Sequence, residues 1–261
     1  MAGDTLSHPS DTNAINALLW LSPRQRDLLK TVAFVAMVGD HLASAGVITG
    51  MASLLLHAAG RVAFPLFALV CACNLSGRTL RQSSLNKLWL MAILAQPAFW
   101  FALNRAGVAW YQLNILFCFA AAMQGVRFVD RPVWRTAFAA LAAMLFYLPL
   151  SGASYGLRGV VLVLASIVLY RVPVILRPMV IVVWLAAVLL LNLPNGPVMM
   201  LCGLVLTLTA WVGIQRCGQN SDRRLALGRY FSEAYVLHLA LIGVLTELRF
   251  ASTCAAQAVA F

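Results

Sequence analysis

The sequence predicts an all-α, polytopic integral membrane protein with about nine transmembrane helices. Hydrophobic residues make up 62% of the 261 residues and charged residues only 10%, which is more apolar surface than a soluble domain needs. The apolar residues also gather in runs of helical length, separated by short polar gaps. We expect residues 1–22 to form a cytoplasmic or interfacial leader and residues 23–261 to form a single transmembrane domain.

Nine apolar runs are expected to form the spans. Several of them are shorter than the roughly 20 residues of a full crossing, so tilted helices or half-helices fit them as well. Residues 51–59, between the first two runs, are compatible with a re-entrant piece. The expected spans are 27–48, 62–77, 85–104, 111–128, 135–150, 156–170, 174–192, 197–215 and 231–250.

The basic residues predict the orientation of the chain. The formal net charge of +11 does not indicate nucleic-acid binding, because the cations lie in the gaps between apolar runs and not on one face. By the positive-inside rule, the gaps richer in Lys and Arg are cytoplasmic. This places the N-terminus in the cytoplasm and the C-terminus in the periplasm. The richer gaps hold Arg24, Arg26, Lys30, Arg78, Arg81, Lys87, Arg127, Arg131, Arg135, Arg171, Arg177, Arg216, Arg223, Arg224 and Arg229, and the poorer ones hold Arg61, Arg105, Arg158 and Arg249.

The first apolar run carries the clearest candidate site. It reads KTVAFVAMVGDH from Lys30 to His41. Eleven helical steps put His41 roughly 16 Å along the helix from Lys30, about half of a hydrocarbon core, and on the same face. Ionisable groups at that depth are costly and usually face a protein interior or a wet cavity. Asp40 and His41 are therefore predicted to be functional.

The chemistry of this pair follows from its residue types. A neutral imidazole is a general base or nucleophile near pH 7, and a carboxylate that accepts its other N–H raises its basicity. Because neighbouring helical residues do not easily bond to each other, Asp40 is expected to orient His238 or to meet Arg61. No serine elbow, P-loop or HExxH motif occurs.

The remaining polar residues of the spans have weaker signals. We expect Arg61, Asn114, Tyr155, Tyr235 and His238 to support the site or face a substrate. The alternative for each is structural: asparagines often join helices by hydrogen bonds, and a lone histidine is often only packed. The six cysteines form no CxxC pair and no metal spacing with histidine, so we expect no metal site.

Several stretches resemble the TraX family, inner-membrane proteins of F-type conjugation systems that N-acetylate pilin. They are WLSPRQRDLLKTVAFVAMVGDHL (20–42), AGRVAFPLFALV (59–70), NLSGRTLRQSSLNKLW (74–89), NILF (114–117) and PLSGASYGLRG (149–159). The spacing from Lys30 to His41 is also similar to the basic-x10-His signature of membrane acyltransferases that O-acetylate bacterial surface sugars. YVLH (235–238) is similar to a terminal Tyr-x-x-His pattern in those enzymes.

The resemblance implies a multi-pass enzyme of the bacterial inner membrane, encoded on a conjugative plasmid. It would transfer an acetyl group from acetyl-CoA to the N-terminal alanine of conjugative pilin. His41 would be the base or the acetyl carrier, with Asp40 in support. The acidic donor would match a basic cytoplasmic mouth, formed by Lys30, Arg78, Arg81 and Lys87, while Arg61 and Tyr155 would face the pilin.

Other functions remain compatible with the sequence. A non-catalytic chaperone or insertase for pilin would use the buried polar residues only to seat its substrate. A transporter of small anions fits the number of spans but lacks inverted halves with matching broken helices. A nucleic-acid binder is disfavoured because the cations carry the topology signal, and the sequence leaves the oligomeric state open.

Overall fold

The computed structural model describes residues 19–217 and 230–259, and every element in that part of the chain is helical. The α-helices are α2 (Pro23–Ser44), α3 (Gly50–Gly60), α4 (Ala63–Leu75), α5 (Gln82–Leu103), α6 (Ile115–Asp130), α7 (Trp134–Tyr147), α8 (Gly156–Arg171), α9 (Arg177–Asn192), α10 (Pro197–Cys217) and α11 (Phe231–Val259). Short 3-10 turns occupy Asn104–Ala106 (η1), Leu148–Leu150 (η2), Val174–Leu176 (η3) and Leu193–Asn195 (η4). The all-α prediction is confirmed.

Each expected span coincides with one of these helices, and α3 covers the residues compatible with a re-entrant piece. Within the described residues, four helical segments are long and apolar enough to cross a membrane: 50–75, 174–195, 197–216 and 231–255. This supports a membrane protein, while nine crossings and the orientation of the termini stay predictions. Most of the expected leader and the basic gap with Arg223, Arg224 and Arg229 lie outside the described residues.

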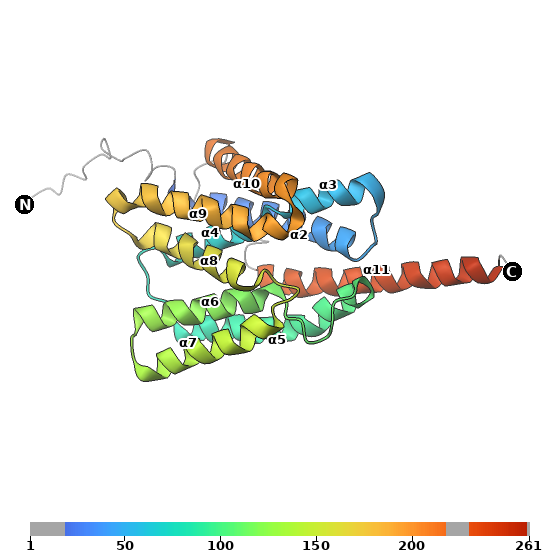
Figure 1. The fold of residues 1–261 in the computed structure, drawn as a ribbon, viewed down its shortest axis with the longest axis horizontal. Helices are drawn as coiled ribbons and strands as arrows, with labels where there is room; N and C mark the ends of the chain where they lie inside the picture. Colours follow the sequence, from blue (N-terminus) through green and yellow to red (C-terminus); the bar gives the residue numbers. More distant parts are fainter. Residues whose placement is uncertain (1–18, 218–229, 260–261) are drawn as a thin grey trace, which may run out of the picture.

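The helices form two groups that meet in the middle of the bundle (Figure 1). One group contains α2, α3, α4, α8, α9 and α10, and the other contains α5, α6, α7 and α11. Helix α11 packs along α5 and also contacts α2, and its last turns extend past the other helices (Figure 1). This packing brings the C-terminal part of the chain against the first described α-helix.

The start of α2 follows directly from its sequence. Ser22 is the N-cap: its hydroxyl accepts from the Gln25 backbone N–H at 3.2 Å, and the Gln25 side chain accepts from the Ser22 N–H at 2.8 Å. Pro23 takes the first helical position, where the N–H that proline lacks has no helical partner anyway. This capping box fixes where α2 begins and therefore where Lys30 and His41 stand along it.

Helices α3 and α4 form one apolar segment broken at Arg61 and Val62. Pro65 lies in the first turn of α4, where its missing N–H costs no hydrogen bond. Gly60 ends α3 against α2, and a Cβ atom there would lie 2.7 Å from Cγ of Asp40. Glycine therefore permits the close approach of α3 to α2 that sets Arg61 beside Asp40.

Candidate active site

Two histidines from opposite ends of the chain meet at the centre of the bundle. His41 of α2 and His238 of α11 are 3.0 Å apart, from Nδ1 to Nε2, and their rings are nearly parallel at 6°. Phe34 and Tyr235 pack edge-on against His238. The contact forms because α11 returns to α2, and no pattern around either residue predicts it.

The hydrogen bonds around this pair assign its tautomers. His238 Nδ1 lies 3.2 Å from the Ala234 carbonyl oxygen, which only accepts, so Nδ1 of His238 carries the proton. In a neutral ring Nε2 of His238 is then an acceptor, and His41 donates to it from Nδ1. Nε2 of neutral His41 is left with a free lone pair and receives no hydrogen bond from the described residues.

The Asp40 carboxylate makes its hydrogen bonds with other residues than these two histidines. Its Oδ1 atom lies 2.8 Å from Nδ1 of His57 and 2.9 Å from Nη2 of Arg61. Arg61 also donates from Nε to the His57 carbonyl oxygen at 3.1 Å, one helical turn away. Of the two partners expected for Asp40, the structure provides Arg61 and not His238.

A cavity of about 800 Å³ lies beside part of this cluster. Asp40, His41 and Arg61 line it. We call it the main cavity. The loop before α8 closes one side with residues 151–158, where Tyr155 packs against Phe64 at 4.8 Å between ring centroids. Tyr147 holds this loop by donating its hydroxyl to the Ser154 carbonyl oxygen at 2.8 Å.

Two smaller cavities neighbour the main cavity on the side of Lys30, each sharing lining residues with the next. The first, the apolar cavity, measures about 220 Å³ and shares Met37, Phe67, Ile115 and Tyr235 with the main cavity. The second, the basic cavity, measures about 240 Å³ and is lined by Pro23, Arg26, Asp27, Lys30, Asn74 and Arg78. Lys30 and Asn74 line both of the smaller cavities. The three cavities thus adjoin in a row from Arg78 to His41.

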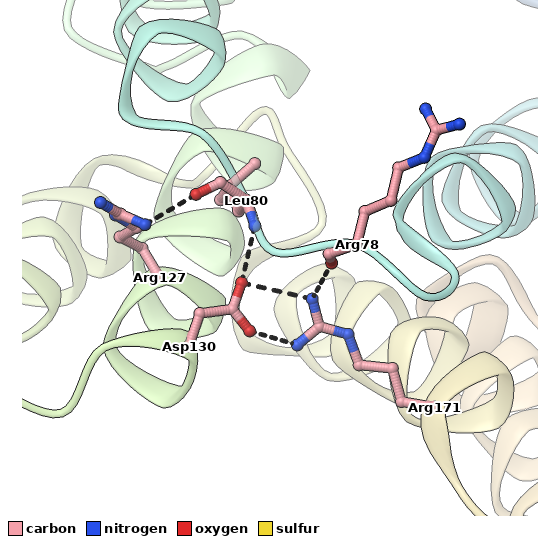
Figure 2. Close-up of polar contacts among 5 residues, drawn as sticks. All are labelled: Arg78, Leu80, Arg127, Asp130 and Arg171. Atoms are coloured by element: carbon pink, nitrogen blue, oxygen red, sulfur yellow. Dashed lines mark hydrogen bonds and ion pairs between the residues drawn. The ribbon is translucent and has the colours of Figure 1, made fainter.

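The loop at residues 76–81 carries two of the predicted donor residues and is held by its backbone (Figure 2). Asp130 accepts from the Leu80 N–H at 2.7 Å, and Arg127 donates to the Leu80 carbonyl at 2.8 Å. Arg171 pairs with Asp130 at 2.6 Å and donates to the Arg78 carbonyl at 3.2 Å. We call Arg127, Asp130 and Arg171 the loop brace.

The charge of Asp130 is stabilised by these contacts. Asp130 follows the expected span 111–128. Burial alone would raise the pKa of its carboxyl, but the hydrogen bonds from Arg171 and the Leu80 N–H and the charges of Arg171 and Arg127 outweigh that effect. The pKa of Asp130 therefore lies below its ordinary value, and the carboxylate is ionised at neutral pH.

The predicted donor residues are only partly brought together. Lys30 and Arg78 line the basic cavity, with the Lys30 ammonium 2.6 Å from Asp27. Arg78 and Arg81 line a neighbouring surface cavity of about 760 Å³. Lys87 lines none of these cavities and is exposed on α5.

The other predicted residues differ in their surroundings. Tyr235 lines the main and apolar cavities and is buried. Asn114 is fully buried outside them: it caps α6 by accepting from the Leu116 N–H, and it donates to Ala92 and Gln96. Its contacts are those of a residue that joins α5 to α6. Among the described residues no group of three or more His, Cys, Asp and Glu side chains is arranged to hold a metal ion.

Sequence reasoning missed His57. The signal was present in LLLHAAGR (54–61), where an isolated histidine stands four residues before Arg61 in an apolar stretch. Residues four apart share a helix face, so a helix through this stretch places His57 and Arg61 on the same side. Their common partner, Asp40, lies on another helix and is found only in the folded chain.

Comparison with known proteins identifies the family of the chain. The family model described as TraX protein matches residues 25–246. The chain is 41% identical over 245 residues to a protein named Protein TraX from Escherichia coli, covering 93% of this chain and 95% of the relative. A second Protein TraX, from Escherichia coli strain K12, is 42% identical over the same shares of both chains. No solved structure matches. The chain therefore belongs to the TraX family.

Proposed function

We propose that this protein transfers an acetyl group from acetyl-CoA to the N-terminal amine of a conjugative pilin, alanine by family resemblance, at the bacterial inner membrane. The observation that carries the proposal is that Nε2 of His41 receives no hydrogen bond from the described residues, in a side chain that lines a cavity at the middle of the bundle. His238 fixes the other ring nitrogen. An imidazole held in one tautomer beside a cavity, with an unpartnered basic nitrogen, is suited to act as base or nucleophile.

The row of cavities suits the shape of the donor. The phosphates of acetyl-CoA would bind at the basic cavity, near Lys30, Arg26 and Arg78. Its uncharged arm would pass through the apolar cavity, lined by residues such as Met37 and Phe67. The thioester would then reach His41, which stands roughly 16 Å along α2 from Lys30.

The chemistry has two routes through His41. As a base, Nε2 takes a proton from the amine while the amine nitrogen attacks the thioester carbonyl carbon. A C–N bond forms, the C–S bond breaks, and the proton passes to the departing thiolate. As a carrier, Nε2 attacks the thioester carbonyl carbon, so that an N–C bond forms, the C–S bond breaks and coenzyme A leaves as a thiolate. The amine then attacks the acetyl-imidazole, the bond from Nε2 to the acetyl carbon breaks, and the proton lost by the amine passes to the released thiolate. In both routes an acceptor that starts as ammonium also releases one proton to solvent.

The intact mass of pilin co-expressed with the native protein tests the proposal. We expect a gain of one acetyl group, about 42 Da by its formula, with the native chain and none with His41→Ala. Variants must be shown to insert in the membrane at native levels. Acetylation that survives in His41→Ala would overturn both routes. If no acetylation occurs with donor present and pilin still matures, the chaperone or insertase function replaces the enzyme.

Acid-quenched single-turnover samples separate the two routes. An acetyl group found on the protein before pilin is added, and absent from His41→Ala, supports the carrier. Acetyl transfer without any acetylated protein at times shorter than one turnover supports the base.

A further inference from the structure

The two oxygens of Asp40 have different surroundings. Oδ1 accepts from both His57 and Arg61, at 2.8 and 2.9 Å. Oδ2 receives no hydrogen bond from any residue in the described part of the chain, although the Asp40 side chain lines the main cavity with His41. A partly buried carboxylate oxygen without a donor is costly unless water or a ligand supplies one.

The neighbours of Asp40 also restrict how it turns. His57 and Gly60 come from the last turn of α3 and Arg61 follows it directly, and Gly60 leaves no room for a Cβ atom beside the Asp40 side chain. Arg61 is itself tied to the His57 carbonyl oxygen. Because both donors hold Oδ1, turning the carboxylate would break both hydrogen bonds, which favours the orientation that leaves Oδ2 without a donor.

A primary amine matches this free oxygen. It offers N–H donors to a carboxylate, and it is the group that acyl transfer at His41 requires. Arg61 balances the charge of Asp40, and Arg158 lines the same cavity. A second full positive charge there is disfavoured by both arginines, which promotes loss of a proton from the ammonium before it attacks.

We propose that Oδ2 of Asp40 binds the amine of the acceptor, and that His57 is a positioning residue that holds Asp40 for this contact. The inference rests on the proposed acetyl transfer and adds how the acceptor is recognised. A primary amine enters the main cavity and donates one N–H to Asp40. His41 then assists the attack of the amine on the acetyl carbon. The bonds that form and break are those of the proposed reaction, and Asp40 takes no part in them as an acid or a base.

Binding alone gives the first test, and it does not require any acetyl transfer. The probes are an apolar peptide with a free N-terminal alanine and the same peptide N-acetylated, each in lipid nanodiscs with the purified protein. We expect the native chain to prefer the free amine by about 10- to 100-fold, as for a charge-assisted hydrogen bond. Asp40→Asn should remove this preference, and equal preference in both proteins would overturn the inference.

Kinetics give the second test. In Asp40→Asn the kcat/KM for the amine peptide should fall by about 10- to 100-fold, with the KM for acetyl-CoA changed by less than about threefold. For a peptide with a hydroxyl in place of the amine, kcat/KM should fall much less in the same variant. An equal fall of kcat/KM for both acceptor peptides, or a change confined to the KM for acetyl-CoA, would overturn the role of Asp40 in amine binding.

His57 supplies a matched pair of variants. His57→Gln keeps an N–H donor for Oδ1 and should retain most of the amine preference, whereas His57→Phe removes the donor and should lose about tenfold. Both are compared at equal thermal stability, which separates positioning from folding. Identical behaviour of the two variants would overturn the positioning role. If the native chain prefers the amine but acetylates nothing, the proposed function fails and the amine site stands.

Discussion

Asp40 and Asp130 are both carboxylates paired with arginine, yet their surroundings are opposite. Asp130 uses both oxygens: Oδ1 accepts from Arg171 at 2.6 Å, and Oδ2 accepts from the Leu80 N–H at 2.7 Å and from Arg171 at 3.3 Å. Asp40 receives both of its donors on Oδ1 and faces a large cavity. Asp130, whose two oxygens both accept hydrogen bonds, holds the backbone of a loop. Asp40, whose donors are both on one oxygen, has the other oxygen left for a ligand.

The difference extends to what each carboxylate positions. Asp130 and Arg171 bind the main chain of the loop at residues 76–81, while the Arg78 guanidinium points away from them (Figure 2). The loop brace therefore leaves that side chain free to line the basic cavity. The number of hydrogen bonds that each carboxylate oxygen accepts therefore distinguishes these two ion pairs. An oxygen without a donor beside a cavity can accept a hydrogen bond from a ligand.

The largest effect is expected from crowding the Asp40 site. In Gly60→Ala the new Cβ would lie 2.7 Å from Cγ of Asp40, so α3 or the carboxylate must move. We expect acetyl transfer to fall by about 100-fold, the scale of a misplacement near 1 Å. Gly125→Ala is the control, since its Cβ would meet nothing within 4 Å, and it should retain native activity. Equal activity in both variants would contradict the close approach of α3 to Asp40.

Removing the charge of Asp130 should affect stability and donor binding more than turnover. We expect Asp130→Asn to lose about 2 kcal/mol of stability, through weakened hydrogen bonds to a charged group. Its KM for acetyl-CoA should rise about tenfold while kcat stays within about threefold, because the loop with Arg78 loosens. Thermal unfolding in detergent and steady-state kinetics measure the two effects. A loss of kcat equal to that of Asp40→Asn would erase the distinction between the two carboxylates.

The pH dependence of stability should report Asp130 directly. The pKa of Asp130 is lower in the folded chain than in the unfolded chain, where an aspartate titrates near about 3.9. Its ion pair therefore contributes fully above that value, and the contribution is lost as the pH falls through the folded pKa. The stability difference between the native chain and Asp130→Asn should stay constant from about pH 7 to 5 and shrink below about pH 4. A difference that grows in acid would contradict the assignment.

The smallest effect is expected at an exposed pair. Arg105 and Glu247 are 2.9 Å apart, with side chains 45% and 37% exposed. Exposed ion pairs gain little against solvent screening and side-chain entropy. Glu247→Gln should leave the apparent melting temperature and the acetylation of pilin unchanged. A decrease as large as that of Asp130→Asn would mean that the end of the bundle around Arg105 is more tightly coupled than its exposure indicates.

The sequence alone determined the helices and the first half of the site. In an apolar run every backbone group must bond within its own segment, so the runs predict helices wherever they occur. An acid and a histidine at mid-span are costly enough to predict a functional role for Asp40 and His41 before any partner is known. The capping box at Ser22 likewise follows from four neighbouring residues, because all of its contacts are local.

The sequence named Arg61 and His238 as alternative partners of Asp40, and only the tertiary structure decided between them and brought His238 to His41. His238 is 197 residues from His41, and Asp40 draws its donors from α3 and not from α11. Spacing along one helix says which face a residue takes, but not which helix comes to lie against that face. That choice depends on the packing of the whole bundle. The break at Arg61 and the absence of a side chain at Gly60 allow α3 to pack against Asp40, while His41 contacts His238 of α11.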